Sequence, residues 1–294
     1  MRKEAVALAL IVGTLFPGVV FASGGPTKVA GSLPYHRSDN EFISAIVLDA
    51  ASRKVLYEYK ADQKHPAASL TKLMGALVFL DHRPAWNAVV SLKAADEVGG
   101  GRLRVASGAT LSVLDLFYSS ITASANNAAT AMARVSGLGT AGFVRAMNKK
   151  AKALGLATTT FTDPSGIEPT NVTTAREIAT LALAAFDADP IRRSATTAVY
   201  RFKIRNTGQA KEIRSTDDLL TSPAHDDLYV TGGKTGFIYE SMYNFVVKVR
   251  PTTDTDPKRT LMVVVFGAPT RESSFASAKA LAQWAWKAYR WDAK

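Results

Sequence analysis

The chain has 294 residues, of which 47% are hydrophobic and 21% charged, so it can bury a large core and lacks the composition of a disordered protein. It carries a formal net charge of +11 and no cysteine, which excludes disulfides, thiol catalysis and thiolate metal sites. The histidines show no metal-binding spacing, so we expect neither a metal nor another cofactor; they are His36, His65, His82 and His225.

Residues 1 to 22 have the pattern of a secretory signal peptide. A basic pair at positions 2 and 3 precedes an apolar run from residue 5 to 21, and Ala22 ends a small-residue cleavage site. We expect cleavage after Ala22 and an exported, extracytoplasmic protein, periplasmic where the cell has a periplasm; an uncleaved anchor is the alternative. Because export separates the protein from nucleic acid, we expect the scattered basic residues to form a solvated face or to meet anionic lipid or wall polymers.

In chain order, residues 23 to 41 are rich in Gly, Pro and Ser, which predicts an extended segment. Two β-type runs within residues 42 to 60 flank a polar turn at 51 to 54 and predict a hairpin. The apolar spacing from residue 69 to about 80 follows the period of a helix.

The middle of the chain predicts helices and one structured loop. Thr174, with Glu177 three residues later, predicts a capping box at the start of the last of these helices. The predicted helices cover residues 111–121, 124–137, 142–155 and 173–186, and a loop rich in Pro and Gly covers 160–173. Three β runs follow at 227–237, 243–250 and 259–268, and a helix at 275–291 ends the chain.

Strands at both ends of the chain with helices between them predict an α/β protein of the α+β type, in which helices pack on the faces of an antiparallel sheet. No repeat or linker interrupts residues 42 to 291, so we expect a single domain over residues 42–294, after the signal peptide and the segment 23–41.

One short motif, "PAASLTKLM", carries potential chemistry. A serine hydroxyl is a weak nucleophile that needs a neighbouring base, and a lysine with a lowered pKa can be that base. Ser69 and Lys72 are three residues apart, so on a helix they share one face. Alone, this spacing is also expected by chance in a chain of this length.

Two further motifs contribute groups of the right kind. "SANN" supplies a hydroxyl and a carboxamide, Ser124 and Asn126, between two predicted helices. "GGKTG" lies on a predicted strand, where Lys234 and Thr235 suit the binding of a carboxylate and the glycines allow close approach of another backbone. The simpler interpretations are a helix cap for Ser124 and an edge-strand charge for Lys234.

In this order, the three motifs resemble the S-x-x-K, S-x-N and K-T-G signature of the serine penicillin-recognising enzymes. Within that group of enzymes, the chain resembles the D-alanyl-D-alanine carboxypeptidases, which are low-molecular-mass penicillin-binding proteins. "FVRAMNKKAKALGL" and "FTDPSGI" followed by "TTAREIA" extend the resemblance over about residues 42 to 288. It implies a five-stranded antiparallel sheet flanked by helices, with the site at the edge of the K-T-G strand.

The resemblance also implies a role for each motif residue. Ser69 would be the nucleophile that forms an acyl-enzyme, Lys72 its general base, and Ser124 a proton relay to the leaving D-alanine. Asn126 would orient Lys72 and the substrate amide, and Lys234 and Thr235 would bind the terminal carboxylate of a peptidoglycan stem peptide that ends in D-Ala-D-Ala. β-Lactams would be covalent inhibitors.

The glycine of the third motif and the residue after it complete the implied site. Gly236 would border the bound substrate, and the backbone N–H groups of Ser69 and Phe237 would form the oxyanion hole. A literal "SDN" at residues 38 to 40 precedes Ser69, and because the family order places this element after the nucleophile, we do not assign it to the site.

Two features depart from the family pattern. Ile238, Ser241 and Met242 follow the K-T-G motif where the family usually has a Thr and a small Ala-Gly pair. The chain also ends one helix after the sheet, without the second domain and the amphipathic C-terminal anchor of many relatives, so no anchor of that kind is expected.

We therefore predict a serine-type D-Ala-D-Ala carboxypeptidase acting on peptidoglycan. The first alternative is a D,D-endopeptidase that cuts cross-links, because the short form resembles that branch. A β-lactamase is the next alternative, with Glu168 in place of the deacylating glutamate, although its surroundings fit a structural loop better. A penicillin-binding scaffold without catalysis is the last; no G-x-S-x-G motif supports a Ser-His-Asp hydrolase.

Overall fold

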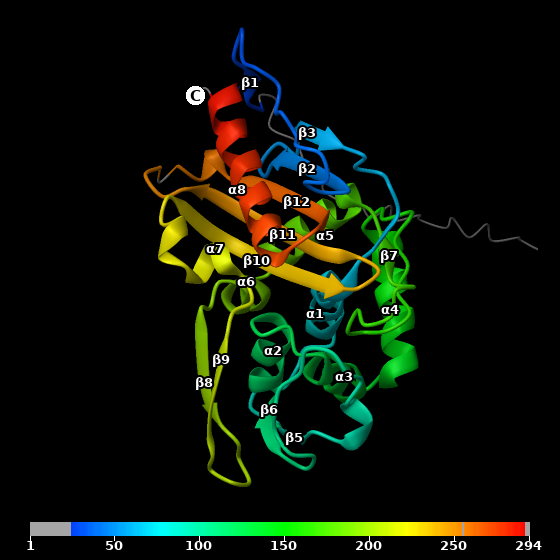
Figure 1. The fold of residues 1–294 in the computed structure, drawn as a ribbon. Helices are drawn as coiled ribbons and strands as arrows, with labels where there is room; N and C mark the ends of the chain where they lie inside the picture. Colours follow the sequence, from blue (N-terminus) through cyan, green and yellow to red (C-terminus); the bar gives the residue numbers. More distant parts are fainter. Residues whose placement is uncertain (1–24, 255, 292–294) are drawn as a thin grey trace, which may run out of the picture.

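The computed structural model describes residues 25–254 and 256–291 and places a central β-sheet between helices (Figure 1). The expected signal peptide lies outside the described residues. Among the residues described, no helix combines the length and the apolar character needed to cross a membrane.

The central sheet has five antiparallel strands in the order β10–β11–β12–β2–β3, which confirms the predicted architecture. The two N-terminal strands form the predicted hairpin, and the three C-terminal strands follow one another across the sheet. The strands are β2 Ser44–Asp49, β3 Val55–Tyr59, β10 Leu228–Ile238, β11 Met242–Pro251 and β12 Leu261–Ala268. The K-T-G motif therefore lies on the edge strand β10, next to the helical part of the molecule.

Helices cover both faces of this sheet, and the alternating side chains of the strands enter two separate cores. Val246 and Val264 pack with residues of the N-terminal and middle helices, whereas Val247 and Val263 pack with Phe275 of the C-terminal helix. Successive strand side chains point to opposite faces, so a central strand covered on both sides needs apolar residues throughout. This explains why β12 reads as a continuous apolar run, with every residue buried.

The predicted helices are all present. Their bounds are α1 Thr71–Asp81, α2 Val113–Ile121, α3 Asn126–Val135, α4 Gly139–Ala153, α5 Ala175–Asp187 and α8 Arg271–Ala288, to which the structure adds two short helices, α6 Asp189–Ala195 and α7 Asp218–Thr221. Short 3-10 turns occur at Ala68–Leu70, Ala94–Asp96, Pro223–His225 and Pro257–Arg259.

The capping box predicted for α5 is only half formed. The Thr174 hydroxyl accepts a hydrogen bond from the Glu177 N–H at 3.1 Å, as predicted. A full capping box also needs the Glu177 carboxylate to accept a hydrogen bond from the Thr174 N–H. Here that carboxylate accepts from the Thr158 N–H and the Thr159 hydroxyl instead. That part of the prediction is wrong because the loop before α5 offers the carboxylate two other donors.

Several small two-stranded sheets were not predicted. The longest is the hairpin β8–β9, which Figure 1 shows projecting from the body of the molecule beside α2. Its strands alternate charged and half-buried residues and lack a continuous apolar face, so their sequence gives a weak strand signal. The paired strands of the small sheets are β1 Thr27–Lys28 with β13 Tyr289–Arg290, β4 His65–Pro66 with β7 Val172–Thr173, β5 Val89–Ser91 with β6 Thr110–Ser112, and β8 Val199–Lys203 with β9 Ala210–Arg214.

Candidate active site

Ser69 lies in the 3-10 turn directly before α1, and two glycines let other segments close around this turn. Ala68, the residue before Ser69, has a left-handed backbone with φ 48°. A Cβ on Gly166 would lie 1.9 Å from the Ala68 carbonyl oxygen, and a Cβ on Gly236 would lie 3.3 Å from the Ser69 nitrogen. The turn is thus held between the loop 160–173 and the edge strand β10, which fixes Ser69 in a strained, well-defined position.

Lys72 lies one turn of helix further on and is 1% exposed. Its Nζ lies 2.8 Å from Ser69 Oγ, 2.7 Å from Asn126 Oδ1 and 2.5 Å from the Ser165 carbonyl oxygen. Burial first, and the nearby Lys234 second, lower the pKa of Lys72 well below its usual value. The neutral form of this amine is therefore much easier to reach than that of an exposed lysine, which suits a group that accepts a proton from the Ser69 hydroxyl.

Ser124 and Asn126 reach the site from the junction of α2 and α3. Ser124 has a left-handed backbone, φ 56°, which turns the chain between the two helices. Its Oγ accepts a hydrogen bond from Lys234 Nζ at 2.7 Å. Asn126 accepts from Lys72 and donates its Nδ2 to the Gly99 carbonyl oxygen at 2.9 Å, so its amide orientation is fixed.

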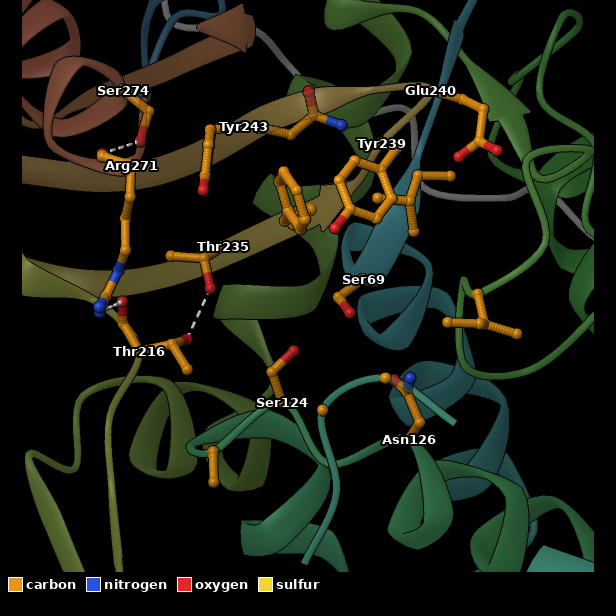
Figure 2. A pocket seen from close by; sticks show the side chains of 18 of the residues that line it. Ser69, Ser124, Asn126, Thr216, Thr235, Tyr239, Glu240, Tyr243, Arg271 and Ser274 are labelled. Atoms are coloured by element: carbon orange, nitrogen blue, oxygen red, sulfur yellow. Dashed lines mark hydrogen bonds between the residues drawn. The ribbon is translucent and has the colours of Figure 1, made fainter. Parts of the chain in front are cut away.

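The edge strand β10 supplies the opposite wall of the site. Lys234 is 1% exposed, and burial lowers its pKa to about 7, a shift that Asp217 opposes. Thr235 faces the cavity, and its hydroxyl shares a 2.6 Å hydrogen bond with the Thr216 hydroxyl (Figure 2). Phe237 is 41% exposed at the rim. All motif residues that the sequence singled out thus lie around one place.

These side chains surround a cavity of about 650 Å³. Ser69, Ser124, Asn126 and Thr235 line it, and Figure 2 shows the two serine hydroxyls directed toward the same space. A serine hydroxyl beside a buried amine, with a second hydroxyl held by a second lysine, forms an arrangement suited to acyl transfer. Among residues 25–254 and 256–291, no group of three or more His, Asp or Glu side chains has a geometry that could hold a metal ion.

Sequence reasoning missed several residues that line this cavity. Arg271, at the start of α8, donates from Nη2 to the Thr216 carbonyl oxygen at 2.8 Å, which places a cation beside Thr235 (Figure 2). On the other side of Ser69, Tyr239 and Glu240 of the β10–β11 turn also line the cavity. None of these residues belongs to a motif; only the fold brings them to the site.

The three residues that depart from the family pattern have different positions. Ile238 is 8% exposed and lines the cavity. Ser241 is fully buried and binds inside the turn, where its hydroxyl donates to the Met242 carbonyl oxygen at 2.8 Å. Met242 lines a separate pocket with Phe42. Only Ile238 therefore contacts the space in which a substrate would bind.

Two other residues weighed from the sequence lie away from the cavity. Ser38 precedes β2, where its N–H donates to the Glu41 carboxylate at 3.0 Å. Glu168 is exposed on the loop 160–173, and its N–H donates to Asp163. Neither side chain lines the space around Ser69.

Comparison with known proteins agrees with this geometry. A family model described as D-alanyl-D-alanine carboxypeptidase matches residues 34–270. A D-alanyl-D-alanine endopeptidase of Pseudomonas aeruginosa is 30% identical over 97% of this chain and 89% of its own. A D-alanyl-D-alanine carboxypeptidase of Bacillus subtilis is 26% identical over 95% of this chain and 71% of its own. The solved structure of a D-alanyl-D-alanine carboxypeptidase from Mycobacterium tuberculosis is similar with a TM-score of 0.74 at 26% identity, covering 89% of this chain and 96% of that one.

Proposed function

The chain belongs to the D-alanyl-D-alanine carboxypeptidase family and is a serine-type hydrolase, and from this premise we propose that Ser69 forms the acyl-enzyme. The substrate class is a peptidoglycan stem peptide that ends in D-Ala-D-Ala, and penicillin would acylate the same serine. The observation that carries this proposal is the contact of Ser69 Oγ, which lines the cavity, with the buried Lys72 Nζ at 2.8 Å.

In the proposed acylation, Ser69 Oγ attacks the carbonyl carbon between the two D-alanines while neutral Lys72 takes the hydroxyl proton. The bond to the leaving D-alanine then breaks, and Ser124, held by Lys234, relays the proton that Lys72 took up to the amine of the leaving D-alanine, so that Lys72 and Ser124 both return to their starting forms. In the second step water attacks the ester, releases the shortened peptide and restores the Ser69 hydroxyl.

We expect residues on both sides of Ser69 to bind the substrate. Lys234, Thr235 and the cationic Arg271 would bind the terminal carboxylate, and Asn126 would contact the substrate amide. The N–H groups of Ser69 and Phe237 would stabilise the oxyanion, and Gly236, which lets β10 pack closely on the Ser69 turn, would border the bound peptide. Loss of one oxyanion donor typically slows such a reaction about 100- to 1000-fold.

A second candidate is cleavage of cross-links between two stem peptides. The Pseudomonas aeruginosa relative, whose name is that of an endopeptidase, is 30% identical to this chain, compared with 26% for the Bacillus subtilis carboxypeptidase. Both activities use the same acyl-enzyme and differ in the group that leaves. We keep the carboxypeptidase as the main proposal and the endopeptidase as its alternative.

The family acts on the cell wall outside the cytoplasm. We propose that residues 1–22 direct export, that cleavage follows Ala22 and that the mature protein is periplasmic where the cell has that compartment. Residues 42–294 would form one catalytic domain, preceded by the segment 23–41.

Purified peptidoglycan decides between the candidates. Incubation with wild-type protein should release fragments whose masses identify the bond: free D-alanine means carboxypeptidase, and separated dimers mean endopeptidase. The Ser69→Ala variant is the control and should release neither. Equal release by both proteins would exclude catalysis through Ser69, and turnover of labelled penicillin within seconds would favour a β-lactamase.

A further inference from the structure

Asp217 is a buried carboxylic acid that the proposed reaction does not use. It precedes the short helix α7 and is 2% exposed. Its Oδ1 accepts the Leu219 N–H at 3.0 Å, as a helix-capping side chain does. Its Oδ2 has no hydrogen-bond partner among the residues that the structure describes. Capping therefore explains one oxygen of this carboxylate and leaves the other unexplained.

Gly233 lets this second oxygen approach β10. A Cβ built on Gly233 would lie 2.0 Å from Asp217 Oδ2, so a larger residue would displace the carboxylate. Gly233 directly precedes Lys234. The glycine of the "GGKTG" motif thus admits a carboxylate oxygen to the strand one residue before the site lysine.

Lys234 is a buried lysine whose amine donates, among the residues that the structure describes, to neutral oxygens only. Its Nζ donates to Ser124 Oγ at 2.7 Å and to the Thr235 carbonyl oxygen at 3.0 Å. Burial raises the pKa of Asp217 to about 7 and lowers that of Lys234 to about 7, and each charge opposes the shift of the other. The charge of Asp217 therefore favours the protonated form of Lys234, and the charge of Lys234 favours the ionised form of Asp217.

We propose that Asp217 is a positioning residue, whose carboxylate supplies the negative charge that keeps Lys234 protonated and directed at Ser124. The proposal rests on the role proposed above for Lys234 in the acylation of Ser69. The charge acts across Gly233, behind the strand, so Asp217 itself does not touch substrate.

Other charged groups surround this pair but do not replace Asp217. Lys72 is itself a lysine, whose pKa the charge of Lys234 lowers, so it supplies no negative charge to Lys234, and Arg271 lies at the cavity beside Thr216. The charged side chains on the elements packed against β10 already have partners. On α7, Asp218 pairs with His225 of the following turn. On β11, Lys248 pairs with Asp187 and Arg250 donates to the Asp254 carbonyl oxygen, and on α6, Asp189 pairs with Arg192 and Arg193.

The variant Asp217→Asn separates the charge from the cap, because asparagine caps a helix about as well as aspartate. We expect an unchanged melting temperature together with a shift of the alkaline limb of the acylation profile by about one pH unit toward acid. Acylation by fluorescent penicillin should then be roughly tenfold slower at pH 8 and similar to wild type at pH 6. Asp218→Asn is the matched control; it removes one charge at the next residue and should leave the alkaline limb in place.

The outcomes are distinct. A wild-type protein that penicillin does not acylate would contradict the proposed function. Normal acylation by wild type with the same pH profile in Asp217→Asn would overturn only the role of Asp217. Asp217→Ser, which also retains a capping side chain, serves as a second variant, with circular dichroism to show that each is folded. If neither variant folds, the carboxylate is needed for the fold itself and the proposal is wrong.

Discussion

Nζ of Lys72, in the first turn of α1, lies 2.8 Å from Oγ of Ser69, in the 3-10 turn directly before that helix. A lysine buried to 1% exposure is costly, since its charged form loses hydration. The hydrogen bonds to Asn126 and to the Ser165 carbonyl compensate for part of that cost and fix the nitrogen in place. The structure therefore holds the Lys72 amine against the Ser69 hydroxyl at a cost in stability, as the roles proposed for them require.

The first prediction concerns Lys72→Arg. Because burial lowers the pKa of Lys72, its amine loses its proton as pH rises, and the acylation rate of wild type should rise through that pKa on the acid side. Arginine keeps its proton at every accessible pH, so the variant should acylate about 100- to 10,000-fold more slowly from pH 5 to 9.

Stopped-flow acylation with fluorescent penicillin measures this effect. Lys150→Arg is the matched control, because Lys150 is an ion-paired surface lysine far along the chain from the site, and it should behave as wild type. Acylation by Lys72→Arg within tenfold of wild type would show that the group acts as a positive charge and not as a base.

The second prediction compares two glycines with the same backbone conformation. Gly166 has φ 83° and Gly155 has φ 75°, so Ala at either position adds the strain of a left-handed backbone. Only at Gly166 would the new Cβ meet another atom, the Ala68 carbonyl oxygen at 1.9 Å; at Gly155 nothing lies within 4 Å. Gly166→Ala should therefore lose about 1–3 kcal/mol more unfolding free energy than Gly155→Ala.

The same pair tests the position of Ser69. Displacement of the Ser69 turn by the Gly166→Ala side chain should slow penicillin acylation about 100-fold, because small misplacements of a nucleophile are that costly. Urea unfolding and acylation rates measure the two effects. Equal stability and equal rates in both variants would mean that the loop 160–173 does not hold the Ser69 turn.

The third prediction concerns Arg271, which lines the cavity beside Thr235 and donates to the Thr216 carbonyl. Arg271→Ala should lower kcat/KM for a D-Ala-D-Ala peptide about 10- to 100-fold, since a hydrogen bond to a charged group contributes about 1.5–3 kcal/mol. A peptide with a C-terminal amide lacks the carboxylate and should be cleaved equally by wild type and variant. An equal loss on both peptides would assign Arg271 to the fold of the Thr216 loop instead.

The sequence predicts the motif residues of this site but not the residues that surrounding loops and α8 bring to it, and this difference has a physical origin. Ser69, Lys72, Ser124 and Lys234 stand in short motifs whose spacing reflects their chemistry. Loop geometry and contacts across long stretches of chain bring Asp217, Thr216 and Arg271 to the site, and these leave no periodic pattern in the sequence. The same reason separates the central sheet, with its continuous apolar runs, from the half-charged hairpin β8–β9.

The last prediction concerns Glu168, the residue that would have to promote deacylation in a β-lactamase. Its side chain is exposed and does not line the cavity, and the loop around it is held by Asn171. Asn171 accepts the Thr162 N–H at 2.6 Å and donates to Asp163 at 2.5 Å. Glu168→Ala should therefore leave the lifetime of the penicilloyl-enzyme within about twofold of wild type.

Asn171→Ala is the contrasting change at this loop. It removes a fully buried side chain and leaves several polar partners unsatisfied, which should lower the free energy of unfolding by about 1–3 kcal/mol or more. Mass spectrometry of the acyl-enzyme over time measures the lifetime, and urea unfolding measures the stability. A much longer lifetime in Glu168→Ala would show that this carboxylate activates the deacylating water, and the β-lactamase alternative would then replace the peptidase.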